Sequence, residues 1–255
     1  MGRLKDHFIE LQNQAAEEWI QDRLSDKDLD EDSDEWKGLL QEFYDYQIYL
    51  LEEEEHEEEL RWLKENGSSK IHKFFIDELN ALERIIDESL KKEKKLSFVF
   101  NSQLIAKMAF AHSVALLEAF LGDTLKSLLN ENEKLLENAI SNIDELKKAR
   151  YSLKDLAKTS SDTKTLAIRK VSDILFHNIP KVKIIYEQVL GKKLNVDISK
   201  VSKITDLRHH IVHRNGKTID GECINISSSD LSNAISSIKE FASELQKEIN
   251  KENNA

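Results

Sequence analysis

The sequence predicts an all-α protein, because residues that turn a chain are rare in it and charged residues are common. Its 255 residues include only 7 glycines and 1 proline, while 33% are charged and 7% are aromatic. A sheet-rich protein of this size would need more turn residues and more β-branched runs. The length permits one large or two small domains with a sizeable core. We therefore expect helices from end to end.

Two helices are predicted in the N-terminal region, on either side of an acidic loop. The first carries apolar residues at helical spacing: Leu4, Phe8, Leu11, Ala15, Trp19 and Ile20. Residues 25–34 (SDKDLDEDSD) break this pattern and predict the loop. A long helix is expected over residues 35–64. Its apolar face consists of Trp36, Leu39, Leu40, Phe43, Leu50 and Leu51.

The second half of this long helix contains a strongly acidic run, EEEEHEEE, at residues 52–59. Such a run is typical of a helix surface that faces water, because neighbouring like charges repel one another. A second interpretation is that the acidic segment masks a basic site, either in this chain or in a partner.

A domain boundary is predicted at Asn66-Gly67-Ser68-Ser69, a sequence that typically ends a helix and begins a linker. It separates an acidic helical extension, residues 1–68, from a helical domain, residues 69–255. A further helix is expected over residues 71–96, ending in a basic turn at Lys91–Lys95.

The most apolar helix is expected over residues 101–129, buried on most sides. His112 and Glu118 interrupt its apolar sequence, and we expect both to be hydrogen-bonded groups of the core. Residues 132–176 predict one or two more helices with a polar break at Thr159–Thr163.

The C-terminal part predicts three more helices. The only proline, Pro180, can open a helix that Gly191 ends. A helix over residues 199–215 follows, stopped by Gly216, and residues 217–227 form a loop or a small hairpin around Asp220-Gly221. Ser229-Asp230 predicts the N-cap of a last helix. The apolar face of this helix consists of Leu231, Ile235, Ile238, Phe241, Leu245 and Ile249.

The net charge of −11 is unevenly distributed. Residues 1–90 carry 10 Lys and Arg against 27 Asp and Glu, a net charge of −17, whereas residues 91–255 carry 27 against 21, a net charge of +6. The acidic half would repel nucleic acid, and the second half would tolerate it.

Cysteine content and hydropathy indicate the compartment. The single Cys223 cannot form a disulfide within the chain, which favours a reducing environment. The N-terminal MGRLKDHFIEL has no apolar signal core, and no uninterrupted apolar run of about 18 residues appears anywhere. We expect a soluble, cytoplasmic protein that does not enter a membrane.

The stretch LRHHIVHRNG, residues 207–216, holds three of the chain's 8 histidines and two arginines. At about 100° per residue, one arc of this helix collects the apolar side chains Val201, Ile204, Leu207 and Ile211. The histidines fall on the other side: His209, His210 and His213. Arg208 falls at the border between the two faces. The histidines are therefore predicted to face water, a ligand or another subunit.

Three interpretations of this cluster are open. It can be a wet polar face without a role. It can bind zinc, because His209 and His213 have i, i+4 spacing; the neighbouring arginines and the lack of a third ligand argue against this. It can act on phosphodiesters, because a histidine moves protons near neutral pH and an arginine binds phosphate in a forked geometry. RNA supplies its own nucleophile, the 2′-hydroxyl, so this chemistry requires no metal.

The cluster resembles the motif of the HEPN superfamily, an arginine and a histidine at R-x4-6-H spacing with a polar residue after the arginine. Arg208 to His213 matches the R-x4-H form, with His209 at the polar position. The preceding LLEAFLGDTL (residues 116–125) and the ending HRNG (residues 213–216) are also similar. The resemblance is nearest to the RiboL-PSP-HEPN branch and covers roughly residues 100–250.

The resemblance implies an all-α bundle, here a HEPN-like helical bundle with an N-terminal acidic extension. It implies a homodimer whose two motifs line one cleft, with no cofactor and no metal. The implied activity is endoribonucleolytic, leaving 2′,3′-cyclic phosphate and 5′-hydroxyl ends. Such proteins act in toxin–antitoxin and other antiphage defence systems of bacteria.

The resemblance also implies residue roles. Arg208 would hold the scissile phosphate, His213 would be the general acid or base, and His209 would assist. We expect the remaining polar residues of the stretch, His210, Arg214 and Asn215, to bind the RNA. Some HEPN toxins carry a tyrosine, which an antitoxin modifies, where Asn215 stands here. That route of control is therefore not expected.

Two further hypotheses follow from the acidic N-terminal region. One is a non-catalytic HEPN-like module that binds a protein partner, such as an antitoxin or a larger defence complex. The other is that residues 1–68 restrain the basic half of the chain electrostatically, which would make RNA binding depend on salt.

Overall fold

The computed structural model confirms the all-α prediction. It describes residues 2–25, 30–91, 98–151 and 162–253. Within these residues, the one pairing of extended backbone is an isolated antiparallel bridge between Lys217 and Cys223. The chain divides into two compact units, Met1–Arg61 and Trp62–Ala255. The division falls inside a helix, shortly before the boundary expected at residue 68.

The N-terminal unit consists of α1 (Gly2–Gln21) and the first part of α2 (Asp34–Lys91). Its small core consists of Ile20, Leu24 and Trp36, with Trp19, Leu39 and Leu40 packed against it. Between the two helices, the backbone N–H and the hydroxyl of Ser25 both donate to the Glu35 carboxylate at 2.7 Å.

The apolar face predicted for α2 is buried near the start of the helix and exposed farther along. Phe43 is buried, whereas Leu50 and Leu51 are 41% and 61% exposed. Leu11 of α1 is also 51% exposed, so the two stripes pack together only near their connection. The acidic run 52–59 lies on α2, where buried His56 places its Nδ1 3.4 Å from Glu59 Oε2.

The helix stop predicted at Asn66–Ser69 is a kink. Gly67 adopts φ 63° and ψ 167°, and α2 resumes directly after it. The left-handed φ suits glycine, because a side chain at that φ meets the backbone. The helix predicted over residues 71–96 is thus the second part of α2, described as far as Lys91. The expected basic turn at Lys91–Lys95 falls largely on residues 92–97, which lie outside the described residues.

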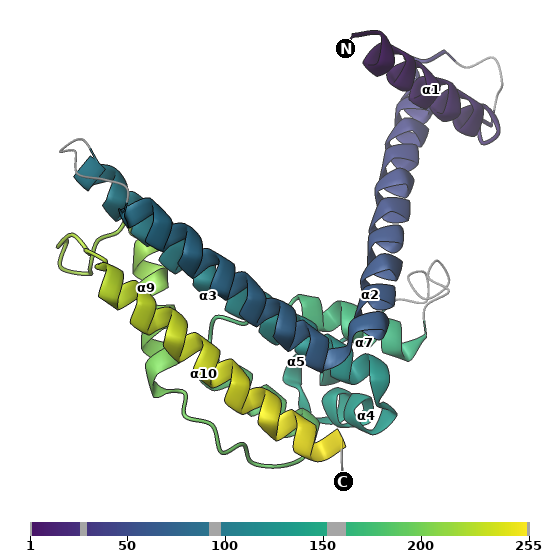
Figure 1. Cartoon of the computed structure of the whole chain (residues 1–255). Coiled ribbons are helices and arrows are strands. Elements are labelled where there is room, and N and C mark those ends of the chain that lie inside the picture. Colours follow the sequence, from purple (N-terminus) through teal and green to yellow (C-terminus); the bar gives the residue numbers. More distant parts are fainter. Residues whose placement is uncertain (1, 26–29, 92–97, 152–161, 254–255) are drawn as a thin grey trace. The chain divides into compact units, whose positions relative to one another are not determined.

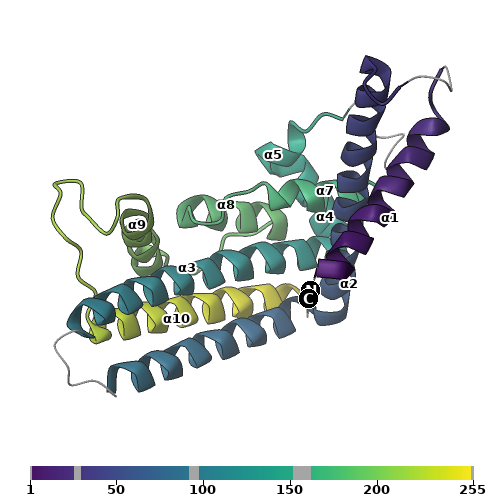
Figure 2. The same ribbon diagram turned by 90° about the horizontal axis from the view of Figure 1, so that it is seen from above.

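The second unit is built around α3 (Phe98–Glu131), which packs against α4 (Glu133–Asn142), α7 (Thr163–Ser172), α9 (Ser199–His213) and α10 (Ser228–Asn253). The second part of α2 lies beside α10 and α3 (Figures 1 and 2). Phe75 of α2 stacks on Phe120 of α3 with centroids 4.6 Å apart. This three-helix layer places the beginnings of α3 and α10 at one end of the unit.

The composition of α3 suits its central place. Ser102–Glu131 is long and apolar enough, with a mean hydropathy of 1.6, to cross a membrane by length and composition alone. Lys107 and Glu118 lie within this segment, so it is not an uninterrupted apolar run, and the expectation that no such run occurs is not contradicted. Core helices of soluble proteins meet the same criterion, and burial against four helices accounts for much of the apolar content of α3.

The two polar residues expected in the core of α3 behave differently from the prediction. His112 is exposed, because it follows Met108, itself 63% exposed, by one turn on the uncovered side of the helix. Glu118 is half-buried, and its Oε1 is shielded from solvent without a hydrogen-bond partner in the described residues. Neither is the hydrogen-bonded core group that was expected.

Residues 132–176 hold more helices than the one or two expected. Their described part contains α4, the short α5 (Asp144–Lys147) and α7, which begins at Thr163. Much of the predicted polar break at Thr159–Thr163 lies outside the described residues. In α8 (Ile179–Leu190) Pro180 occupies the first turn, and Gly191 ends the helix at φ 66°.

The last helix, α10, has the predicted apolar face but a different cap. Leu231, Ile235, Ile238, Phe241, Leu245 and Ile249 are all buried. Its N-terminus is capped by Ser227 and not by Ser229. The Asp230 N–H donates to the Ser227 hydroxyl at 3.1 Å and the Ser227 N–H donates to Asp230 Oδ2 at 2.9 Å, a reciprocal capping box.

Candidate functional site

The predicted cluster lies on α9, which crosses near the beginning of α3 (Figure 2). The helix ends at His213, two residues earlier than predicted. Its buried residues are Val201, Thr205 and Ile211. They define the face that packs on the unit and therefore fix the direction in which every side chain of the cluster points.

Arg208 lies within the buried arc of α9 and not at its border. On an ideal helix it falls between Thr205 and Ile211, which are both buried. Its Nε is shielded from solvent and has no hydrogen-bond partner in the described residues. The side chain as a whole is only half-buried, so the end of the guanidinium remains accessible. Such a group is held in place by its stem and keeps donors for a ligand.

His209 and His213 face away from the core, as predicted. Both are exposed, and their ring centroids lie 4.8 Å apart with a 44° tilt. The prediction is only partly right for His210, which is half-buried and whose Nδ1 is shielded without a hydrogen-bond partner. The exposed part of the cluster is therefore a pair of imidazoles one turn apart.

The electrostatics of this pair favour a neutral His209. Partial desolvation, followed by the positive charges of His213, His210, Arg214 and His177, lowers the pKa of His209 below its usual 6.5. Crowded cationic groups disfavour the protonated imidazole. A neutral histidine can accept a proton or a hydrogen bond at neutral pH.

His177 is a neighbour of the cluster that the sequence did not single out. It is exposed and lies in the connection between α7 and α8. Its charge contributes to the lowered pKa of His209, so the fold brings the two residues near each other. An isolated histidine outside a motif carries no sequence signal for such a role.

The turn after α9 holds Arg214 and Asn215 outside the helix, where both are exposed. Asn215 has φ 53° and Gly216 has φ 70°. The Gly216 N–H donates to the Ile211 carbonyl at 3.1 Å, which closes the helix end. The consecutive left-handed residues turn the chain sharply, so that Arg214 and Asn215 lie at the C-terminal edge of the histidine pair.

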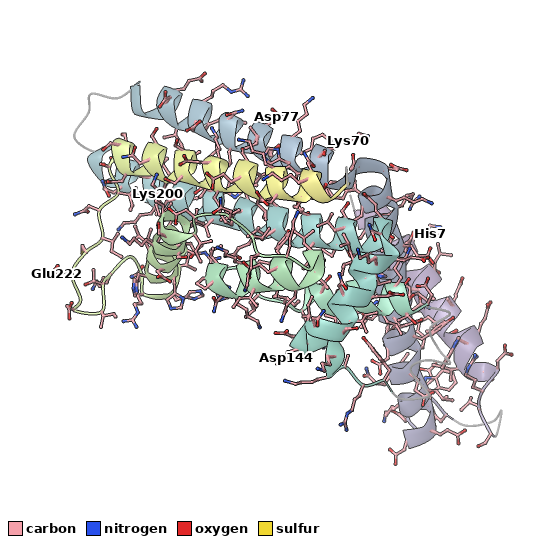
Figure 3. All side chains as sticks on the ribbon, turned by 90° about the horizontal axis from the view of Figure 1, so that it is seen from below. His7, Lys70, Asp77, Asp144, Lys200 and Glu222 are labelled. Atoms are coloured by element: carbon pink, nitrogen blue, oxygen red, sulfur yellow. The ribbon has the colours of Figure 1, made fainter. Side chains whose placement is uncertain are left out.

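The connection to α10 is the small hairpin that was one of the two expectations. Thr218 N–H donates to the Glu222 carbonyl at 2.9 Å, and Glu222 lies at the outer edge of the loop (Figure 3). The Gln103 side chain of α3 donates to the Ile226 carbonyl at 3.2 Å and accepts from the Ile226 N–H at 3.1 Å. A single amide thus pairs both backbone groups of Ile226 and holds the connection on α3.

A second residue of α3, Lys107, contacts the start of this connection. A Cβ built on Gly216 would lie 2.8 Å from Lys107 Nζ. The ammonium therefore lies against the turn that follows the motif. Lys107 was not among the candidate residues, because only the tertiary packing of α3 on α9 brings it there.

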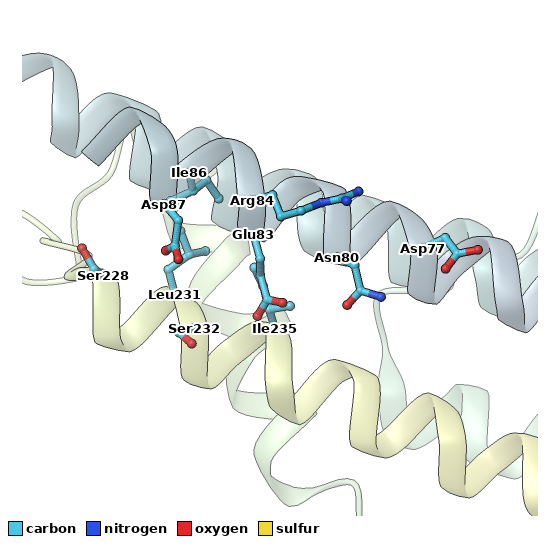
Figure 4. A pocket seen from close by; sticks show the side chains of 10 residues that line it. All are labelled: Asp77, Asn80, Glu83, Arg84, Ile86, Asp87, Ser228, Leu231, Ser232 and Ile235. Atoms are coloured by element: carbon cyan, nitrogen blue, oxygen red, sulfur yellow. The ribbon is translucent and has the colours of Figure 1, made fainter. Parts of the chain in front are cut away.

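The described residues contain no group of three or more His, Cys, Asp or Glu side chains placed to hold a metal ion. The three histidines do not line either of two grooves in the described residues. A groove of about 670 Å³ lies between α2 and α10 and is lined by acidic residues such as Glu83 and Asp87 (Figure 4). A second of about 530 Å³ includes Lys203 and Leu207 of α9 but none of the three histidines.

Comparison with known proteins adds one finding. The family model described as RiboL-PSP-HEPN matches residues 75–251, which include the second part of α2 and all of α3, α9 and the turn after it. No curated protein and no solved structure matches the chain.

Proposed function

The chain belongs to the RiboL-PSP-HEPN family, and we propose that it is a metal-independent endoribonuclease that uses Arg208 and His213 of α9. Membership supports action on RNA or nucleotides in general terms. The observation that carries the narrower proposal is the pairing, on one helix, of an accessible arginine with exposed His209 and His213.

The proposed reaction is transfer of the phosphate within the RNA strand. A histidine acting as base accepts the proton of the 2′-hydroxyl, whose oxygen attacks the phosphorus. The bond from phosphorus to the 5′-oxygen breaks, and a histidine acting as acid protonates that oxygen. The products are a 2′,3′-cyclic phosphate and a 5′-hydroxyl. Arg208 stabilises the charge that accumulates on the phosphate oxygens.

Within this reaction His213 is proposed as the main acid or base and His209 as its assistant. The lowered pKa of His209 suits a neutral group that accepts a hydrogen bond from the 2′-hydroxyl. The same assignment leaves His210, Arg214 and Asn215 as contacts to the RNA strand. Arg214 and Asn215 are exposed at the edge of the histidine pair, where a strand leaving the site would pass.

A composite site made by two copies of the chain is part of the proposal. The resemblance to HEPN proteins implies that the motifs of two copies line one cleft, so each copy would add its own Arg208, His209 and His213 to the site. Val212, next to His213, is 47% exposed and would be covered by a second copy. The proposed cellular setting is bacterial antiphage defence or a toxin–antitoxin pair, with a protein partner that holds the nuclease inactive.

The second candidate function is a non-catalytic module that binds a protein partner. Exposed apolar residues on one face of α2 favour it: Tyr44 at 46%, Ile48 at 55% and Leu51 at 61%. Such a surface resembles an interface more than an ordinary solvated helix. The two functions differ in whether the purified chain cuts RNA.

The deciding experiment is an RNA cleavage assay of the purified chain in EDTA, beside His213→Ala and Arg208→Ala. The proposal predicts cleavage that survives EDTA, gives cyclic phosphate ends and falls at least a hundredfold in either variant. Circular dichroism should remain unchanged. Intact RNA after incubation with the folded parent would favour the binding module instead.

A further inference from the structure

Lys107 is a solitary charge on an otherwise uncharged stretch of helix. Between Phe98 and Leu117 of α3 it is the only Lys, Arg, Asp or Glu. A lysine there can simply increase the polarity of an apolar helix. However, Lys107 is half-buried, and its side chain turns toward α9 instead of projecting into solvent.

The contact with Gly216 fixes where this charge lies. A Cβ on Gly216 would lie 2.8 Å from Nζ, 3.5 Å from Cε and 3.6 Å from Cδ of Lys107. The last three heavy atoms of the lysine therefore lie along the glycine. Gly216 follows His213 by three residues, so their Cα atoms are at most about 11 Å apart. The ammonium is thus beside the proposed site.

No carboxylate compensates the charges gathered here. Lys107, Arg208 and Arg214 form no ion pair with the described residues. A further cation, Lys217, directly follows Gly216. No acidic residue occurs between Asp206 and Asp220 in the sequence. Like charges held together without counter-ions destabilise a fold and attract anions. Their accumulation is therefore a cost that a bound polyanion would offset.

We propose that Lys107, together with Arg214 of the turn, binds a second phosphate of the RNA strand, next to the one held by Arg208. The assignment rests on the proposed function. Two arrangements of the chain support it: α3 supplies the lysine, and the left-handed Asn215 and Gly216 let the turn approach it. Gln103, one turn before Lys107, holds the far end of the same connection.

The competing role for Lys107 is structural. A cation at the C-terminal end of α9 would stabilise the last carbonyl groups of the helix. That role predicts a loss of stability when the charge is removed, with no change in the salt dependence of RNA binding. A phosphate contact predicts the reverse, because each contact releases counterions from the nucleic acid.

The test uses the full chain carrying His213→Ala, so that RNA is bound without being cut. Binding of a single-stranded RNA oligonucleotide is measured by fluorescence anisotropy over a salt series, with thermal melts alongside. Lys107→Met should weaken binding several-fold at low salt and reduce the slope of log K against log salt by about 0.7. Lys107→Arg should keep most of the slope, and replacing the exposed Lys134 of α4 by Met should leave it unchanged.

The outcomes separate this proposal from the proposed function. An unchanged slope in Lys107→Met, with or without a lower melting temperature, overturns the second phosphate site while leaving the nuclease intact. A parent chain that binds no RNA overturns both. Inorganic phosphate, added at constant ionic strength, should compete with RNA more strongly in the parent than in Lys107→Met. Equal loss of RNA binding in both proteins would overturn a dedicated phosphate site at Lys107.

Discussion

The rings of His209 and His213 lie one turn apart on α9 with centroids 4.8 Å apart, and both face solvent. Two imidazoles at this distance cannot both be protonated without repulsion. The arrangement explains why His213 contributes to the lowered pKa of His209. It also makes the pair a natural proton donor and acceptor in a reaction near neutral pH.

The first prediction concerns the titration of this pair. In the folded chain His209 should titrate below 6.5, and His213→Ala should bring its pKa closer to 6.5 by removing one positive neighbour. The shift should be partial, because desolvation, the larger cause, remains. The measurement is an NMR titration of the ring protons. A pKa of His209 that does not rise in the variant would contradict the coupling of the two rings.

The same shift has a consequence for stability. Because folding lowers the pKa of His209, the unfolded chain binds more protons on this residue at pH values just below 6.5. Its contribution to stability is therefore least favourable at acidic pH and the penalty disappears as pH rises above 6.5. His209→Gln should make the melting temperature less dependent on pH between about 5 and 7. His7→Gln, on exposed α1, serves as the control.

The third prediction concerns the turn after the motif. Gly216→Ala should lose roughly 1–2 kcal/mol from the left-handed backbone, and its Cβ would displace only the end of the flexible Lys107 side chain. Gly191→Ala is a matched control, since Gly191 has φ 66° but its nearest neighbour would lie 3.7 Å away. Urea unfolding of the two variants should show similar losses. A clearly larger loss for Gly216→Ala would mean that Lys107 cannot yield to the added methyl group.

The fourth prediction concerns the amide of Gln103. Gln103→Ala removes both hydrogen bonds to Ile226 and should cost about 1–3 kcal/mol of stability. Hydrogen exchange at the Ile226 amide should accelerate, because that N–H loses its acceptor. Gln246→Ala, which removes a buried amide on α10, should leave exchange at Ile226 unchanged. Unaltered protection at Ile226 would show that the connection is held by other contacts.

The fold was predictable wherever one helix face alone decides burial. The six apolar residues predicted on α10 are all buried, because every turn of that helix packs on the unit. The periodicity of α2 predicted Leu50 and Leu51 equally well, yet they are exposed. Sequence spacing shows which residues share a face and does not show how far a neighbouring helix covers it.

The part of the candidate site that lies on α9 was largely predictable, and the part from other elements was not. Helical spacing on α9 placed His209 and His213 on the outer face correctly. It placed Arg208 at the border of the apolar arc. The buried arc extends farther, because Thr205 is buried although it is polar. Lys107 and His177 come from other helices or loops, and no local pattern connects them with α9.

The last prediction concerns the acidic N-terminal unit. Residues 1–61 carry 6 Lys and Arg against 21 Asp and Glu, a net charge of −15, while the rest of the chain carries 31 against 27, a net charge of +4. A field of this size opposes the approach of RNA across distances comparable to the Debye length, about 10 Å at 0.1 M salt. Such an effect would not require a contact between the unit and the site.

Replacing Glu54, Glu55, Glu57 and Glu58 by glutamine removes four negative charges from the helix surface while keeping its shape. RNA affinity of the full chain carrying His213→Ala should then rise several-fold at about 0.05 M salt and little above about 0.5 M, where charges are screened. The control replaces two exposed carboxylates of α4 in the other unit, Glu133 and Glu137, and should raise the affinity by less. Because the effect is electrostatic, an affinity gain that persists at high salt would point to a direct contact instead. No gain at low salt would mean that the acidic unit does not restrain the site. The exposed apolar residues on α2 would then be better explained as a surface for a protein partner.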